Sequence, residues 1–251
     1  MSDVNDVIVS SFPQGTPAID LDPRLRAILS HADDNMVLAQ RLGEWISNAP
    51  DLEIDIALGN IALDHLGVAR TLYTHAGQVE GQGRTEDDFA MGRTEREFLN
   101  LLLVEQPNGD FAHTIVRQFF FDVYQLLLWA ELSESDDETL AGVAAKARKE
   151  AAYHHEFSSS WMLRLGDGTD ESHTRTQQAV DALWRFTAEL SEPYADAWQK
   201  GTAMVFSEAG LLVPDDAYQR SGGREGYHTE HLGSLLAEMQ WMDRAYPGMD
   251  W

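Results

Sequence analysis

The stretch IALDHLGVAR, residues 61–70, belongs to the helix on which the fold of this chain depends. The predicted helix begins after Pro50, where three acidic residues favour a helix N-terminus, and it runs to about Ala76. It is apolar on nearly every side, which is typical of a buried helix at the centre of a helical protein. We therefore expect this helix to lie in the interior of the domain.

Apolar residues that recur at spacings of three and four predict further helices on both sides of it. These helices cover about residues 24–47, 93–103, 111–133, 138–165, 172–191 and 229–245. A polar, glycine-rich connector is expected at 77–92, and residues 192–227 show no clear pattern. Because strand-like alternation is rare, the sequence predicts an all-α protein. Four long helices are expected to form an antiparallel bundle, with additional helices toward the C-terminus.

The composition limits the functions that can be expected. Acidic residues outnumber Lys plus Arg by 42 to 18, and the formal net charge is −24. Nucleic acids and anionic membranes require a basic face, so neither is an expected partner. The absence of cysteine excludes disulfides, iron–sulfur clusters and thiol nucleophiles. Residues 1–22 predict an irregular N-terminal arm without the features of a signal peptide, which favours a cytoplasmic location.

The helix around residues 61–70 has unsuitable residues at the positions where a metal-binding bundle helix carries its ligands. In a carboxylate-bridged di-iron bundle, a Glu is followed three residues later by a His, so that both project toward the metals. His65 and Val68 stand at this spacing here, and valine cannot bind a metal. Since a lone histidine on an apolar face is more often a core residue than a ligand, we interpret His65 as part of the core.

Two other helices carry residues of the same kind. Glu150 is followed three residues later by Tyr153, where a di-iron site needs histidine, whereas His154 can share a helix face with Glu150. Asp122 has mostly apolar neighbours on its face and is expected to be buried, where a carboxylate needs a cation, a metal or a proton. A network of hydrogen bonds or ion pairs is the favoured explanation for Asp122.

Some remaining candidates have weaker patterns. Glu44 could be a surface residue by its pattern alone. His228 and His231 flank Glu230, but they lack the four-residue spacing of the helical zinc motif, so no metal site is predicted there.

Five stretches taken together closely resemble the C-subunit family of the bacterial phenylacetyl-CoA 1,2-epoxidases, which are ring-epoxidising multicomponent monooxygenases. They are RLGEWISNAPDLEIDIALGNIALDHLGVAR (41–70), FLNLLLVEQPNGDFAHTIVRQFFFDVYQ (98–125), KEAAYHHEFSSSWMLRLGDGT (149–169), LWRFTAEL (183–190) and GGREGYHTEHLGSLLAEMQWM (222–242). The resemblance extends over about residues 30–251 and is weakest near 192–218.

The resemblance implies a single ferritin-like helical domain at residues 23–251 in a complex of aerobic phenylacetate catabolism. In that family the A subunit holds the di-iron centre and epoxidises the ring with O2, while a separate reductase supplies electrons. The C subunit pairs with A and is regarded as structural. Set against the ligand positions of the catalytic subunit, this chain is degenerate. The positions are Glu44, His65, Val68, Asp122, Glu150 and Tyr153, where His65 replaces a Glu and Val68 and Tyr153 replace histidines. Asp64 matches the Asp that precedes the ligand Glu in the catalytic helix.

We therefore expect a non-catalytic structural subunit that stabilises the catalytic A subunit in a hetero-oligomer. It is expected to have no catalytic, cofactor-binding or metal-binding residues of its own, and the di-iron cofactor is expected in the partner A subunit. Other subunits of the complex and the reductase are further candidate partners. Two alternatives stay open. One is an active di-iron oxygenase or oxidase with displaced ligands that uses His65 and His154, and the other is a free-standing ferritin-like binding protein.

Overall fold

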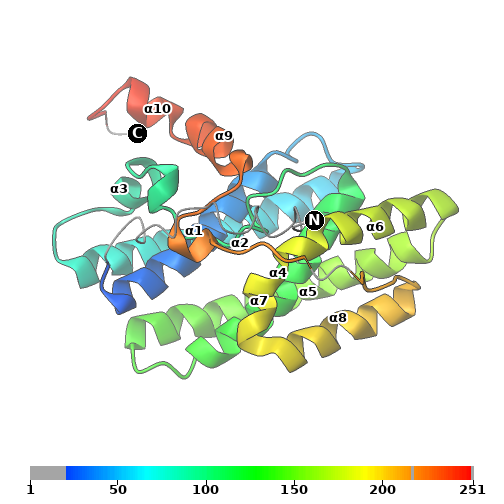
Figure 1. The fold of residues 1–251 in the computed structure, drawn as a ribbon. Coiled ribbons are helices and arrows are strands. Elements are labelled where there is room, and N and C mark those ends of the chain that lie inside the picture. Colours follow the sequence, from blue (N-terminus) through cyan, green and yellow to red (C-terminus); the bar gives the residue numbers. More distant parts are fainter. Residues whose placement is uncertain (1–20, 216–217, 250–251) are drawn as a thin grey trace, which may run out of the picture.

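A computed structural model describes residues 21–215 and 218–249, and these residues form helices and no strands. The bundle consists of the long helices α1 (Pro23–Gly43), α2 (Leu52–Glu80), α4 (Phe111–Leu132) and α5 (Glu138–Gly166). Helix α1 packs on α2 and α4 packs on α5, while contacts between α2 and α5 join the two pairs (Figure 1). The prediction of an all-α, ferritin-like bundle is confirmed.

Contacts at the two ends of the bundle define the helix directions. At one end, the indole of Trp45, just after α1, donates a hydrogen bond of 3.0 Å to Thr114 at the start of α4. At the other end, Arg24 at the start of α1 donates to Asp137, the N-cap of α5. Helices α2 and α4 therefore start at the same end and run parallel, whereas α1–α2 and α4–α5 are antiparallel. Residues 81–110 form the single long crossover of a ferritin-like topology.

The prediction of a helix at residues 93–103 is wrong. A short helix, α3 (Glu86–Met91), lies earlier, within the predicted connector, and a single 3-10 turn (Glu95–Glu97) follows it. Residues 98–104, FLNLLLV, are buried without forming a helix. Their apolar character reflects burial in the core, which a local pattern cannot distinguish from a buried helix.

Carboxylates from other elements satisfy the backbone of this buried segment. The backbone N–H of Leu99 donates to Asp33 and that of Leu101 donates to Asp34, each at 2.8 Å. Both aspartates lie in the middle of α1 and are fully buried. A buried backbone N–H without a partner is costly, so these two side chains allow the crossover to pass through the core without secondary structure.

Each of these aspartates is also paired with an arginine. Arg93 of the crossover donates to Asp33, with Nη1 3.1 Å from Oδ2, and Arg224 lies 2.7 Å from Asp34. Burial raises the pKa of Asp34 to about 6, although Arg224 acts in the opposite direction. The two ion pairs connect α1 to the crossover and to a segment near the C-terminus.

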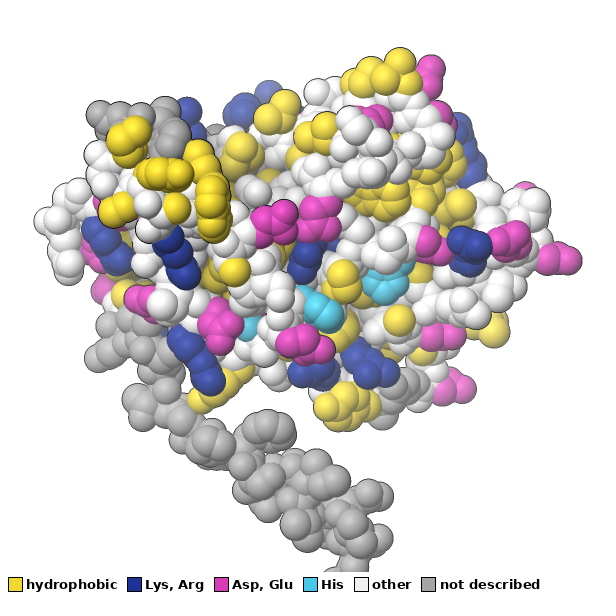
Figure 2. Space-filling view, turned by 90° about the horizontal axis from the view of Figure 1, so that it is seen from above, with side chains coloured by type: hydrophobic (Ala, Val, Ile, Leu, Met, Phe, Trp, Pro, Cys, Tyr) yellow, Lys and Arg dark blue, Asp and Glu magenta, His cyan; other side chains and the backbone are white. Residues whose placement is uncertain are grey.

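The C-terminal part of the described chain covers the bundle with shorter helices. They are α6 (Asp170–Leu183), α7 (Ala188–Ser191), α8 (Ala195–Ala209), α9 (Glu230–Met239) and α10 (Trp241–Ala245). Helices α6 and α8 pack on α4 and α5, so the region without a predicted structure contains a regular helix, and the helix predicted at 172–191 ends early. Exposed hydrophobic side chains gather over α10 and the residues that follow it, and acidic and basic side chains are interspersed across the same view (Figure 2).

Helix α2 is buried on its inner side and exposed on its outer side. The inner face packs in the core through Ile54, Leu58, Ile61, His65, Val68 and Leu72. The outer face exposes several large apolar side chains, so the expectation that α2 lies wholly in the interior is wrong for the single chain. Of the N-terminal arm expected at residues 1–22, residues 1–20 lie outside the described residues, and Asp22 is the N-cap of α1. Within the described ranges, no helix combines the length and apolarity that a membrane span requires.

Candidate functional site

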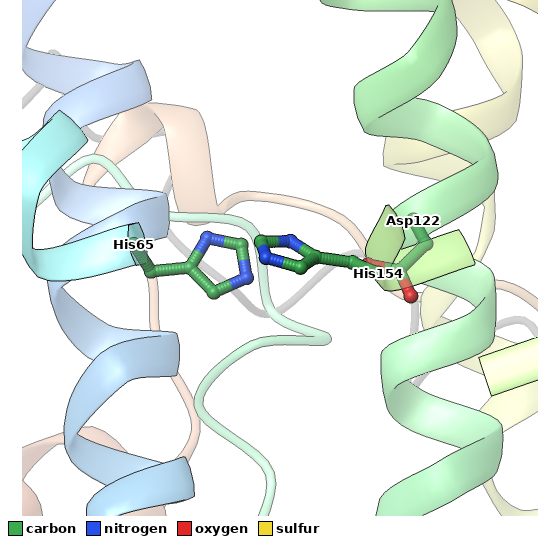
Figure 3. Close-up of side chains that lie close together, drawn as sticks. All are labelled: His65, Asp122 and His154. Atoms are coloured by element: carbon green, nitrogen blue, oxygen red, sulfur yellow. The ribbon is translucent and has the colours of Figure 1, made fainter. Parts of the chain in front are cut away.

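Three side chains of metal-ligand type meet in the centre of the bundle. His65 comes from α2, Asp122 from α4 and His154 from α5, and each offers one ligand atom within 4.8 Å of the other two. The imidazole rings of His65 and His154 point toward one another from opposite helices, and Asp122 lies on the side of His154 (Figure 3). All three residues are buried.

His65 is held by a contact with α1. Its Nδ1 lies 2.7 Å from Oδ1 of Asn35, whose amide nitrogen donates to the backbone oxygen of His31. The bond to His31 orients the Asn35 side chain so that its oxygen faces His65, and His65 Nδ1–H is therefore the donor. The other ring nitrogen, Nε2, is buried and has no hydrogen-bond partner. Burial, assisted by the nearby His154, holds the pKa of His65 well below its usual value. His65 is therefore neutral at pH 7.

His154 approaches His65 from α5, with the ring centroids 5.0 Å apart. Its Nε2 lies 3.1 Å from Oδ2 of Asp64, the acidic residue directly before His65. Burial lowers the pKa of His154, while the carboxylates of Asp64 and Glu150 oppose this effect. The contact with Asp64 connects α5 to α2 across the centre of the bundle.

Asp122 is fully buried, and both of its oxygens have hydrogen-bond partners. Gln118 Nε2 donates to Oδ1 and Ser158 Oγ is bonded to Oδ2, each at 2.7 Å. Burial raises the pKa of Asp122 to about 8, and these two hydrogen bonds only partly offset it. No Lys or Arg of the described chain pairs with this carboxyl. The hydrogen-bonded network expected around Asp122 is present, whereas the ion pair is not, and the group is mainly protonated at pH 7.

The other candidate positions lie outside this cluster or at its edge. Glu44 is exposed at the end of α1, where Arg41 and Asn108 donate to it. Val68 packs in the core. Glu150 pairs with Lys146 at 3.0 Å through Oε1, and its Oε2 is buried without a partner.

The face of α5 that points inward differs from the one predicted. Tyr153 is exposed, and His154 takes the inward position, so the assignment of Tyr153 to a ligand position in the core is wrong. The buried residues Ala147, Ala151, His154, Ser158 and Met162 recur at spacings of three and four. This periodicity was the signal that could have identified His154 and Ser158 as core residues.

The two histidines near the C-terminus, His228 and His231, contact acidic residues. His228 Nδ1 lies 2.9 Å from the buried Glu105, and its Nε2 lies 2.9 Å from the backbone oxygen of Phe98. Burial lowers the pKa of His228, but the Glu105 carboxylate more than offsets this, so the net shift is upward. His231 lies 3.9 Å from the exposed Glu230. His228 therefore connects the C-terminal segment to the crossover, whereas the contact between His231 and Glu230 lies within α9.

The residues of the core do not fit a di-iron centre. Such a centre in a ferritin-like bundle uses four carboxylates and two histidines that all project inward. Within the described residues, the cluster contains a single carboxyl group, and hydrogen bonds occupy both of its oxygens. Val68 stands where a second ligand of α2 would be needed. The arrangement instead supports a neutral, hydrogen-bonded cluster that connects all four long helices.

Comparison with known proteins agrees with these features. The chain matches the model of a family described as phenylacetic acid catabolic protein, over residues 13–197 and 191–251. It is 49% identical over 239 residues to the C subunit of the 1,2-phenylacetyl-CoA epoxidase of Escherichia coli (strain K12). That alignment covers 87% of this chain and 95% of the relative.

Proposed function

Since this chain belongs to the phenylacetic acid catabolic protein family, we propose that it is the C-type subunit of a phenylacetyl-CoA 1,2-epoxidase and has a structural role in that complex. It pairs with a catalytic A subunit, which holds the di-iron centre and carries out the epoxidation. The observation that carries this proposal is the composition of the bundle core: Val68 and a doubly hydrogen-bonded Asp122 occupy ligand positions.

The central cluster supports the structural role through the helices that it joins. Asn35 and His65 connect α1 to α2, Asp64 and His154 connect α2 to α5, and Asp122 and Ser158 connect α4 to α5. These polar contacts lie in an otherwise apolar core, where a hydrogen bond has well-defined partners and geometry. A bundle that keeps its shape without a metal can present a fixed surface to a partner subunit.

The test is co-expression with the catalytic A subunit of the same epoxidase, followed by metal analysis of each chain. We expect the two chains to co-purify. With O2, the reductase and its electron donor added to each sample, we expect turnover of phenylacetyl-CoA by the pair and none by this chain alone. After anaerobic loading with Fe(II), this chain should hold no stoichiometric iron, with the A subunit loaded in parallel as the positive control. Two irons per chain, or failure of the two chains to associate, would contradict the proposal.

One observation favours the alternative of displaced ligands. His65 Nε2 and Glu150 Oε2 are both buried and have no hydrogen-bond partner. Ligand atoms of His65, Asp122 and His154 lie within 4.8 Å of one another, so a transition metal held by the two histidines would be detected in a Co(II) titration by its visible absorption. Binding of Co(II) that His65→Gln abolishes would support the alternative, and an unchanged spectrum up to a tenfold excess of Co(II) would exclude it.

A further inference from the structure

The outer side of α2 carries a continuous apolar surface. Leu52, Ile56, Leu63 and Leu66 expose between 36% and 70% of their surface. Their spacings of four, seven and three residues place them within about 80° of one another around the helix, at 100° per residue. Gly59 lies on the same stripe, and a Cβ at this position would meet no atom within 4 Å. We call these five residues the α2 face.

This part of α2 also lacks the charges of a solvent-exposed helix. Between Asp55 and Arg70 the only charged residue is Asp64, which is already bonded to His154. An amphipathic surface helix normally places charged residues opposite its buried face. In a chain with a net charge of −24, an exposed and nearly uncharged helix face is a marked departure from the rest of the surface. The sequence of α2 is that of a helix covered on all sides, and the single chain leaves one side open.

The first turn of α2, which carries Leu52 of the α2 face, borders a groove that α5 also lines. Tyr153 of α5 is exposed, and it lines a shallow groove together with the first turn of α2. The groove is lined by Phe157 and Trp161 and by a rim of Asp51, Glu53, Glu156 and Arg164, in which acidic residues outnumber the basic one by three to one. The Arg164 guanidinium lies 5.1 Å from the centroid of the Trp161 ring. An apolar centre with a polar, charged rim is the usual composition of a protein–protein interface.

We propose that the α2 face and Tyr153 form the surface that docks the catalytic subunit. The contacting element of that partner is a helix with an apolar ridge, flanked by Lys or Arg side chains opposite the acidic rim. This assignment rests on the proposed function, because similarity to a subunit of a multisubunit enzyme implies that partner chains exist. Charge argues against a second copy of this chain, since two copies would bring identical acidic rims and net charges of −24 together.

Two matched substitutions test the assignment. Leu63→Asp places a charge at the centre of the α2 face, and Met204→Asp makes the same kind of change on α8. The two positions are similarly exposed, at 64% and 62%, but Met204 stands one turn from both Lys200 and Glu208 on a charged surface. The readout is the dissociation constant for the catalytic subunit, together with thermal melting of each free variant. We expect binding to weaken by about 100-fold or more for Leu63→Asp and by less than about threefold for Met204→Asp, with unchanged melting.

A labelling experiment provides a second, independent readout. Because the chain contains no cysteine, Leu63→Cys and Met204→Cys each introduce a unique thiol. We expect a maleimide to react rapidly with both thiols in the free chain. In the complex, the rate at position 63 should fall at least about tenfold, while the rate at position 204 should stay unchanged.

The outcomes separate this inference from the proposed function. If the wild-type chain does not bind the catalytic subunit, the proposed function fails. If it binds but Leu63→Asp binds equally well, or both variants bind equally poorly, the docking surface is wrong while the structural role stands. Slow labelling of position 63 in the chain alone would mean that a second copy or another part of this chain covers the α2 face, and would overturn the inference.

Discussion

Replacement of Asp122 by asparagine should stabilise the protein at neutral pH. Burial raises the pKa of the Asp122 carboxyl from 3.8 to about 8, so the folded chain keeps a proton that the unfolded chain loses. Stability is therefore greatest below the unfolded pKa and falls as the pH rises toward the folded pKa, by about 1.4 kcal/mol per pH unit. At pH 7, retention of the proton costs the folded state roughly 4 kcal/mol, which is an upper bound for the effect of Asp122→Asn.

Asparagine has the shape of the protonated carboxyl and does not ionise. Gln118 Oε1 is buried without a partner and can accept a hydrogen bond from the new amide after a rotation of the Gln118 side chain. Because the hydrogen bond between the new amide and Gln118 is not ideally aligned, the stabilisation is smaller than the upper bound. We expect the free energy of unfolding to increase by roughly 2–4 kcal/mol at pH 7, and this increase should shrink toward zero near pH 4.

Urea unfolding of both proteins at several pH values between 4.5 and 8, followed by circular dichroism, measures this difference directly. Other titrating groups affect the wild type and the variant alike and cancel in the comparison. Asp122→Ala is the control, since it removes the ionisable group but leaves Gln118 and Ser158 unpaired beside a cavity. We expect it to be roughly 2–3 kcal/mol less stable than Asp122→Asn at every pH. A loss of several kcal/mol at pH 7 for Asp122→Asn would refute the reasoning, because it would mean that Asp122 is ionised and paired with a cation or a metal.

Two further predictions concern other buried groups, and a third concerns the net charge. Burial holds the pKa of His65 well below its usual value, so the stability of the protein should decrease as the pH is lowered from about 6.5. His65→Gln should reduce the slope of stability against pH in this range by up to about 1.4 kcal/mol per pH unit, as measured by urea unfolding. Arg224→Met should destabilise the protein by roughly 3–5 kcal/mol, because it leaves the fully buried Asp34 without its cation. Arg224→Lys keeps the positive charge and should destabilise the protein less than Arg224→Met does. Because the net charge is −24, the free chain should not be retained on DNA or on anionic vesicles at moderate salt, and retention in a gel-shift or flotation assay would reveal a basic patch.

The four bundle helices were predictable from the sequence because their signals are local. The observed bounds of α2, α4 and α5 lie within a few residues of the predicted ones, and aspartates cap all three N-termini. The crossover was not predictable in the same way. FLNLLLV is as apolar as a buried helix, and it avoids the helical conformation because carboxylates on α1, more than sixty residues earlier, accept its backbone hydrogen bonds.

The central cluster was predicted in part. Asp122 and His65 were expected in the core, and both are there. On α5, alignment with a metal motif favoured Tyr153, whereas the buried periodicity of Ala147, Ala151 and Ser158 selects His154. The ionisation state of Asp122 depends on which charges lie nearby in three dimensions. Basic residues of the neighbouring helices have other partners, since Arg70 pairs with Glu86 and Lys146 pairs with Glu150.

The hydrogen bonds to Asp33 and Asp34 also mean that hydrogen exchange in part of the crossover reports on unfolding of the whole protein. The amide hydrogens of Leu99 and Leu101 lie outside any helix, where rapid exchange with deuterated solvent would ordinarily be expected. They can reach solvent only if the crossover separates from α1, which also breaks the ion pairs with Arg93 and Arg224. Deuterium uptake by a peptide that spans residues 98–104 should therefore follow the rate of global unfolding, so this irregular segment records the integrity of the entire bundle.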